Sequence, residues 1–299
     1  DRIYRCQNPL RLGRPENMER MYHLCRKIQQ RDYDLFIELH RLIRWSLVLK
    51  PWFFAELSGA DERAGLDTDG RGFFLTRTAS DDPTLVRSQV EWFGDILDEL
   101  GVGVNSLRPE IHLGIEDARS GRDLLEKQDG VNGETVGLFL GANPEFPQKY
   151  WPLDRFVELA QWLNQRFDLN VVGFAGPEEQ DRVRSFRRKT KTTGNIRVLT
   201  GEYPIRTIAG FIQSLDCLIS ADTGPMHMGV ALETPTLGIF GPSEWHWYGT
   251  YPEEFDFVRA GPPGSREKEW KEPDRFPSSM DDVSVDLARK RFKELYENV

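Results

Sequence analysis

The chain has 299 residues, of which 39% are hydrophobic and 29% are charged, and its formal net charge is -9. A mean hydropathy of -0.53 and this length are typical of a globular protein of two domains, and they exclude disordered and membrane-spanning classes. The negative charge argues against nucleic acid as a partner, so an anionic ligand has to be bound by a local site. The cysteines Cys6, Cys25 and Cys217 have no metal-ligand spacing, and their odd number predicts a reducing, cytoplasmic compartment.

The first half of the chain is expected to form an α/β domain over residues 1–130. Residues 33–40 predict a strand, and the following residues predict a helix that Pro51 kinks or stops after Lys50. The aromatic run at 52–54 is interpreted as core packing rather than as an edge facing lipid. Residues 84–100 have apolar side chains at helical spacing and predict a further helix. The sequence Asp-Thr-Asp at 67–69 is followed by Gly70, which favours a turn over a metal site.

The second half, residues 131–280, alternates short apolar runs with amphipathic stretches. Strands are expected at 135–142, 170–176, 196–201, 217–221 and 234–240, with helices between them at 152–167, 178–191, 205–215 and 226–232. This rhythm predicts a doubly wound parallel sheet covered by helices on both faces. The basic residues at 182–191 are interpreted as a solvated helix face, with an anionic membrane surface as the alternative. A surface excursion follows residue 257, and residues 281–299 predict a C-terminal helix.

The segment LISADTGPMHMGVALETPTLGIFGP offers the strongest candidate site. A strand ends at its Ala221, at the sheet edge where doubly wound domains bind ligands. Asp222 is placed to cap the next helix, Thr223 adds a hydroxyl donor, and Gly224 allows close approach to the backbone. Free N–H groups at this helix N-terminus favour a phosphate, toward which His227 can point. An ordinary capped helix with a structural histidine is the alternative, and spacing alone does not separate the two.

Two other loops are expected at the same sheet edge. Lys149 lies between a strand and a helix and can supply a positive charge to a leaving phosphate, and Asn143 can supply a polar contact. Glu178 follows the next strand and can accept hydrogen bonds from ligand hydroxyls, although a glutamate at a helix start also interacts with the helix dipole.

Several motifs together resemble glycosyltransferase family 9, which contains the lipopolysaccharide heptosyltransferases. They are Lys-x-Trp-Pro at 149–152, GFAGPEE, and Asp-Thr-Gly-x-x-His at 222–227 followed by Phe-Gly-Pro-Ser. The resemblance extends over most of residues 33–260. It implies a GT-B architecture of two facing Rossmann-like domains, with the first domain incomplete at its N-terminus. The first domain would then lie on the acceptor side, and the second would bind the nucleotide sugar.

The same resemblance implies an inverting transfer of heptose from an ADP-sugar donor, without a metal or another cofactor. The donor-site residues matched in this way are Lys149, Asp222, Thr223, Gly224, Met226 and His227, with Asn143 and Glu178 as further matches. In this family the general base is an aspartate in a loop near the start of the first domain. We therefore expect the base to precede Asp1, and no catalytic residue is assigned in this chain.

The implied acceptor is a saccharide of the lipopolysaccharide core or a related lipid-linked or protein acceptor. Arg41, Arg44 and Arg71 are candidates for contacts with an anionic acceptor. The expected location is the cytoplasm, with peripheral contact at the inner face of the plasma membrane. Two alternatives stay open, namely a non-catalytic nucleotide-sugar-binding or assembly protein and another nucleotide-sugar enzyme of this fold, such as an epimerase.

Overall fold

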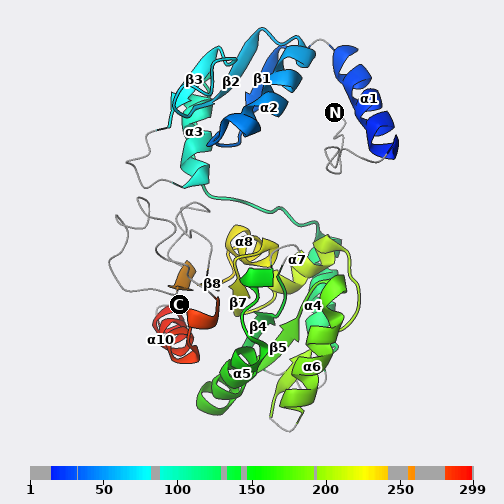
Figure 1. Ribbon diagram of the computed structural model, residues 1–299. Helices are drawn as coiled ribbons and strands as arrows, with labels where there is room; N and C mark the ends of the chain where they lie inside the picture. The colour runs from blue at the N-terminus through cyan, green and yellow to red at the C-terminus, as the bar shows by residue number, and fades with distance from the viewer. Residues whose placement is uncertain are drawn as a thin grey trace. The chain divides into compact units, whose positions relative to one another are not determined.

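The computed structural model describes residues 15–31, 33–81, 88–128, 133–142, 147–191, 194–241, 255–259 and 280–297. These residues fall into two compact units, one ending at Leu107 and the other starting at Arg108 (Figure 1). Neither unit, as far as it is described, has a helix that is long and apolar enough to cross a membrane.

The first unit contains a short parallel sheet in the order β1-β2-β3. Its elements are α1 (Pro15–Gln29), β1 (Leu35–Glu38), α2 (Trp45–Ser58), β2 (Glu62–Asp67), β3 (Arg77–Ser80) and α3 (Gln89–Glu99). The expected strand at 33–40 is confirmed, whereas α1 was not expected. The predicted helix at 84–100 is confirmed from residue 89, and residues 84–87 lie outside the described part. Ser88 and Glu91 form a capping box at its start.

The helix α2 corrects two expectations. It continues through Pro51 to Ser58 and ends at Gly59, which has a left-handed φ of 67°. A proline disfavours helical geometry in the residue before it, but here Val48 and Ala55 are buried on both sides of Pro51 and hold the helix against the unit. Trp52 and Phe53 are exposed, so these two rings do not belong to the core.

The acidic run after β2 is a turn, as the sequence predicts. Asp69 and Gly70 have positive φ values of 51° and 76°, a conformation that glycine and aspartate tolerate better than most residues. Asp67 accepts a hydrogen bond from the Gly72 amide at 2.9 Å. The first carboxylate of the run therefore stabilises the turn itself.

The second unit is built around a parallel sheet in the order β6-β5-β4-β7-β8-β9. Its strands are β4 (Thr135–Phe139), β5 (Asn170–Phe174), β6 (Ile196–Val198), β7 (Cys217–Ala221), β8 (Thr236–Phe240) and β9 (Phe255–Arg259). The helices are α4 (Ile115–Glu126), α5 (Leu153–Phe167), α6 (Gln180–Thr190), α7 (Ile205–Gln213), α8 (Gly224–Ala231) and α10 (Val285–Tyr296), with short 3-10 turns at Pro147–Lys149, Pro177–Glu179 and Met280–Asp282.

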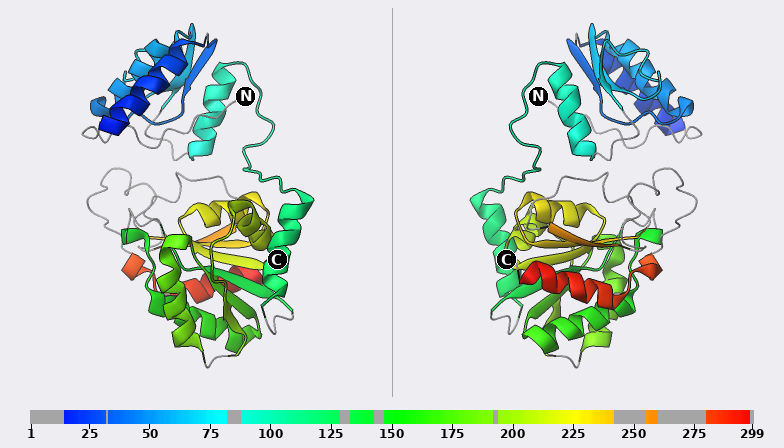
Figure 2. Two further views of the ribbon diagram at one scale, coloured as in Figure 1. Left: turned by 90° about the vertical axis from the view of Figure 1, so that its right-hand side faces the viewer. Right: turned by 90° about the vertical axis from the view of Figure 1, so that its left-hand side faces the viewer.

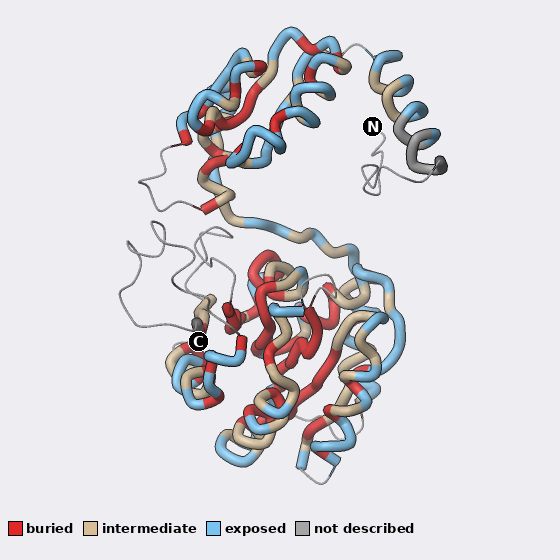
Figure 3. Tube along the Cα trace, viewed as in Figure 1, coloured by how far each residue is buried: buried red, intermediate tan, exposed pale blue. Residues whose placement is uncertain are grey.

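Two hydrophobic clusters lie on opposite faces of this sheet. One joins the strands to α5, α6 and α10 through Phe156, Phe186 and Phe292. The other joins them to α4 and α7 through partly buried Leu124 and fully buried Phe211. Figure 2 shows helices on both sides of the sheet, and Figure 3 shows the strands buried between them. The prediction of a doubly wound parallel domain is confirmed.

The helix α4 packs with the second unit, so the division at residues 107–108 comes earlier than the expected boundary near residue 130. The reason is a close contact with α7. A Cβ added at Gly121 would lie 2.0 Å from the backbone carbon of Gly210, and a Cβ at Gly210 would lie 2.3 Å from the carbonyl oxygen of Asp117. Only glycines allow these backbones to approach so closely.

Candidate functional site

The order of the strands identifies one place in the second sheet where a ligand crevice is expected. The chain builds β4, β5 and β6 outward in one direction and then starts again beside β4 with β7, β8 and β9. The point between β4 and β7 is therefore the topological switch point of the sheet, where open α/β sheets bind ligands beyond the carboxyl ends of their strands. The loop after β4 leads to Lys149, and the bend after β7 begins at Asp222.

The two segments meet through a pair of charged side chains. The Lys149 Nζ donates a hydrogen bond to Asp222 Oδ2 at 2.8 Å, and the His227 Nε2 lies 3.6 Å from Asp222 Oδ1. The side chain of Asp222 is only 5% exposed, while those of Lys149 and His227 are 23% and 39% exposed. One nearly buried carboxylate thus lies between two more exposed nitrogen-bearing groups. The expected proximity of Lys149 to the bend at 222–227 is confirmed.

The bend is followed by the N-terminus of α8. Thr223 is the N-cap residue, with φ -150° and ψ 172°, and its side chain makes no capping hydrogen bond. The expectation that Asp222 caps it is wrong, because this carboxylate contacts Lys149 and His227 instead. The amides of Met226 and His227 donate to the Thr223 carbonyl. The Gly224 amide stands at the first helical position and has no acceptor within the helix.

Gly224 is exposed, and a Cβ built on it would meet no atom of the described residues within 4 Å. The fold itself therefore does not require a glycine at this position. A helix N-terminus without a capping hydrogen bond from its N-cap side chain is suited to an anion, because the helix dipole and the amide both favour negative charge there.

Two residues of the predicted set have other contacts. The Thr223 hydroxyl donates to the Ala221 carbonyl at 3.2 Å and lies 3.2 Å from the Ser220 hydroxyl, so it stabilises the bend rather than offering its proton to a ligand. Met226 is fully buried, and a Cβ added at Gly238 would come within 2.9 Å of its sulfur. Its side chain packs against β8.

A glutamate that the sequence reasoning missed connects the loops around the switch point. Glu178 is exposed, whereas the neighbouring Glu179 turns inward. The Glu179 carboxylate accepts hydrogen bonds from the Ala142 amide at 2.7 Å, from the Tyr150 hydroxyl at 2.7 Å and from the Gly176 amide at 3.1 Å. It thereby joins the loop after β5 to both ends of the loop that carries Lys149.

One glycine in the sequence indicates the contact of Glu179 with the loop after β4. A Cβ added at Gly141 would come within 2.4 Å of the Glu179 carboxylate, so the glycine in Gly-Ala-Asn makes room for it. Burial, the hydrogen bond to Glu179 and the negative charge of Glu179 raise the pKa of Tyr150 to about 12. The phenol therefore stays protonated and remains a hydrogen-bond donor over the physiological pH range.

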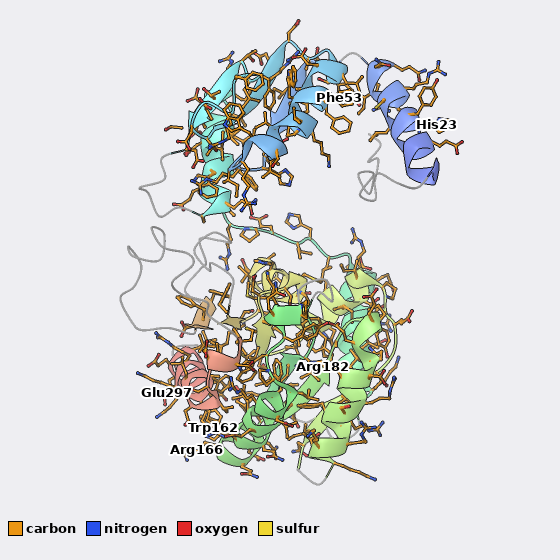
Figure 4. The ribbon with its side chains drawn as sticks, in the orientation of Figure 1. His23, Phe53, Trp162, Arg166, Arg182 and Glu297 are labelled. Carbon is orange, nitrogen blue, oxygen red and sulfur yellow. The ribbon has the colours of Figure 1, made fainter. Side chains whose placement is uncertain are left out.

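Arg182 corrects the interpretation of the basic run as an entirely solvated face. Its guanidinium, which comes from α6 (Figure 4), donates to the Leu140 carbonyl at 2.5 Å and to the Trp151 carbonyl, and it lies 5.1 Å from the centre of the Tyr150 ring. Burial lowers the pKa of Arg182. The other basic residues of the run, Arg184, Arg187, Arg188, Lys189 and Lys191, are exposed as expected.

The remaining predicted residues are distributed as follows. Asn143 lies outside the described residues. In the first unit, Arg41 donates to the fully buried carboxylate of Asp81 at 2.6 Å and lies over the Trp92 ring, so its charge is used inside the unit. Arg71 pairs with Asp69 at 3.0 Å, and Arg44 is exposed at the start of α2. A separate hollow of about 740 Å³ in this unit has a predominantly apolar lining from α1, β1 and α2.

The arrangement in the second unit can stabilise negative charge. An ammonium has three N–H donors, so a contact with Asp222 is compatible with a second acceptor at the Lys149 nitrogen. His227 belongs to the first turn of α8, and its Nε2 lies 3.6 Å from the same carboxylate. An anion is the ligand class that the Lys149 ammonium and the N-terminus of α8 favour.

The sequence belongs to a known family of sugar-transferring enzymes. The model of glycosyltransferase family 9 (heptosyltransferase) matches residues 21–277, so the chain is a member of that family. It is 31% identical over 119 residues to a lipooligosaccharide heptosyltransferase 2 of Campylobacter jejuni subsp. jejuni serotype O:2. This match covers 38% of the chain and 36% of that relative, so the chain spans little more than a third of the relative's length.

Solved structures support the fold. The chain is similar to a glycosyl transferase family 9 protein of Veillonella parvula, with a TM-score of 0.70 and 20% identity over 96% of this chain and 80% of that chain. It is also similar to the ADP-heptose lps heptosyltransferase II of E. coli, with a TM-score of 0.66 and 17% identity over 98% of this chain and 88% of that chain. The predicted GT-B class of α/β fold is therefore confirmed, and the family model confirms the predicted membership of the heptosyltransferase family.

Proposed function

We propose that this protein binds an ADP-heptose donor at the switch point of its second unit and transfers the heptose, with inversion, to a lipopolysaccharide-core or related acceptor. The observation that carries the proposal is the contact of Lys149 with Asp222 beside the N-terminus of α8. The name of the E. coli relative, an ADP-heptose heptosyltransferase, supports the choice of donor.

Breaking the bond between sugar and phosphate leaves negative charge on the departing ADP. The Lys149 ammonium and the N-terminus of α8 stabilise that charge more as the bond breaks than before, which lowers the barrier. Asp222 has a positioning role, since its carboxylate would repel a diphosphate directly but orients Lys149 and His227. The positive charge comes from the protein, so we propose a transfer that needs no metal or other cofactor.

The acceptor hydroxyl must lose its proton to a general base during transfer. We propose that this base and the acceptor contacts belong to the N-terminal domain. Arg44 and Arg71 are proposed as acceptor contacts, whereas Arg41 is a weaker candidate because it pairs with Asp81. Thr223, Met226 and Glu178 are proposed to contribute to the donor site only through the shape of its loops. We place the reaction in the cytoplasm, at the inner face of the plasma membrane.

Calorimetric titration with ADP tests the site. Binding of ADP that is weakened by Lys149→Met and by Gly224→Val, with unchanged circular dichroism, supports it. UDP and GDP are the controls for the base. Product analysis by NMR with ADP-heptose and a core oligosaccharide then tests the reaction, in the presence and absence of EDTA. Release of ADP with a new glycosidic bond supports transfer, whereas an isomerised donor without transfer contradicts it.

A further inference from the structure

The first unit exposes a group of large apolar side chains that its core does not use. Trp45, Leu49 and Phe53 on α2 and Phe73 in the turn after β2 are 60%, 64%, 50% and 59% exposed, and Trp52 is exposed as well. We call these five residues the aromatic patch. Figure 4 labels Phe53 on α2. Isolated exposed apolar residues are common, but a contiguous group marks an interaction surface.

The geometry shows that the patch is contiguous and ordered. Its four α2 residues are spaced i, i+4, i+7 and i+8, which places them on one stripe of the helix. The ring of Phe73 lies 6.4 Å from Trp45 and 5.8 Å from Trp52, so it joins the turn to the helix. The buried stripe of α2 is a different one and includes Val48 and Ala55. This helix is therefore apolar both toward the core and toward its surroundings.

The charges around the patch are basic, although the whole chain carries a net charge of -9. Arg44 precedes α2, and Lys50 is the only ionisable residue between Trp45 and Ala55. Arg71 lies 5.9 Å from the centre of the Trp45 ring. The nearby acidic groups are paired, since Asp69 contacts Arg71 at 3.0 Å and Glu56 contacts Arg63 at 2.5 Å.

We infer that the aromatic patch docks on the surface of a membrane that contains anionic phospholipid. Indole and phenyl rings with a leucine, bordered by arginine and lysine, have the composition of segments that lie in the interface of a bilayer. The rings enter the headgroup boundary, and the long basic side chains reach the phosphates. Protein–protein interfaces are depleted in lysine, so Lys50 beside the patch favours lipid over a second protein. This inference rests on the proposed function, which places the reaction at the inner face of the plasma membrane, and it names the surface that docks there. ADP binding by the second unit does not depend on it.

Co-sedimentation of the full chain with vesicles tests the inference. The vesicles contain phosphatidylcholine with about 30% phosphatidylglycerol, or phosphatidylcholine alone. We expect binding to the anionic vesicles that weakens at about 0.5 M salt. The triple variant Trp45→Ser/Leu49→Ser/Phe53→Ser should bind about tenfold more weakly or worse. Its ADP affinity should equal that of the parent, which separates a failure of docking from a failure of the nucleotide site.

A matched control removes exposed apolar residues elsewhere. Ile115 and Ile205 begin α4 and α7 and are 86% and 73% exposed. The variant Ile115→Ser/Ile205→Ser should bind vesicles like the parent. The variant Arg44→Gln/Lys50→Gln should lose affinity for anionic vesicles and should approach the weaker binding to phosphatidylcholine.

A second measurement remains informative if the triple variant does not fold. Brominated phospholipids should quench tryptophan fluorescence in the parent, and Trp45→Phe/Trp52→Phe should remove that quenching while vesicle binding persists. The inference is overturned if the parent does not bind anionic vesicles or if the triple variant binds them as tightly as the parent does. It is also overturned if the patch instead mediates self-association. In that case sedimentation would show a dimer of the parent that the triple variant does not form, and lipid vesicles would not change the amount of dimer.

Discussion

Replacing Lys149 by methionine should affect stability and ADP affinity by two separable routes. In the folded protein Lys149 Nζ lies 2.8 Å from a carboxylate that is 5% exposed. Removing one partner of a buried ion pair costs about 3–5 kcal/mol, whereas an exposed pair contributes about 0.2–1 kcal/mol. Lys149 itself is 23% exposed and His227 stays 3.6 Å from the same carboxylate. We therefore expect unfolding to become easier by about 2 kcal/mol.

The loss of ADP affinity has a different origin. A hydrogen bond to a charged group contributes about 1.5–3 kcal/mol, which corresponds to about 10- to 150-fold weaker binding. Adding Asp222→Asn removes the carboxylate that has lost its ammonium partner, so the double variant should recover about 1 kcal/mol or more of the stability lost by Lys149→Met alone. It should not recover ADP affinity, because the ammonium is still missing.

Urea unfolding followed by circular dichroism measures the first effect, and calorimetric titration with ADP measures the second. The matched control is Lys189→Met, which breaks the exposed pair of Lys189 with Asp154 at 2.7 Å in the same unit. It should cost less than about 1 kcal/mol and leave ADP binding unchanged. If Lys149→Met binds ADP as tightly as the parent, or loses no more stability than Lys189→Met does, the role assigned to this pair is wrong.

Three further predictions concern the loops and glycines. Gly224→Ala should keep the parent's melting temperature, since its Cβ would meet no atom of the described residues within 4 Å, yet weaken ADP binding in calorimetry; unchanged binding would show that no ligand approaches there. Gly121→Ala should lower the free energy of unfolding in urea by about 3 kcal/mol or more, because its Cβ would lie 2.0 Å from the α7 backbone; a thermal midpoint like the parent's would contradict the packing of α4 on α7. Folding raises the pKa of Tyr150 from 10.0 to about 12, so the folded state favours the neutral phenol. The free energy by which this phenol stabilises the folded protein is therefore fully present below pH 10 and is lost as the pH rises toward 12. Tyr150→Phe should therefore lose less stability than the parent over that range, although Tyr296, whose pKa is also about 12, contributes a similar loss to both proteins. Equal losses in urea unfolding would exclude the contact with Glu179.

The sequence was sufficient for the second domain because its strands are buried on both faces. Every residue of β4, β5, β7 and β8 is buried, and such strands produce the apolar runs that a parallel sheet predicts. The helices α5, α6 and α7 show one apolar face each, so the order of strands and helices alone gave the doubly wound arrangement. The same order placed Lys149 and Asp222 after strands that end at one edge.

Local rules were less reliable where tertiary contacts compete with them. Pro51 predicted a kink or an end of α2, and the end is excluded, because buried residues on both sides of Pro51 carry the helix on to Ser58. Asp222 has a side chain that is well suited to cap a helix, yet its carboxylate pairs with Lys149. A hydrogen bond from a charged ammonium is stronger than one from a backbone amide. The aromatic run at 52–54 looked like core by composition, and composition does not reveal which side of a helix faces the core.

The sequence by itself determined the family, the parallel sheet and the two segments that carry the candidate site, because these depend on patterns along the chain. Tertiary structure alone decided that the switch point lies between β4 and β7, that Glu179 rather than Glu178 turns inward, and that Arg182 supports the loop before α5. The physical reason is that hydrogen bonds and ion pairs between distant segments depend on side-chain direction and strand order. A sequence specifies these only through the complete fold.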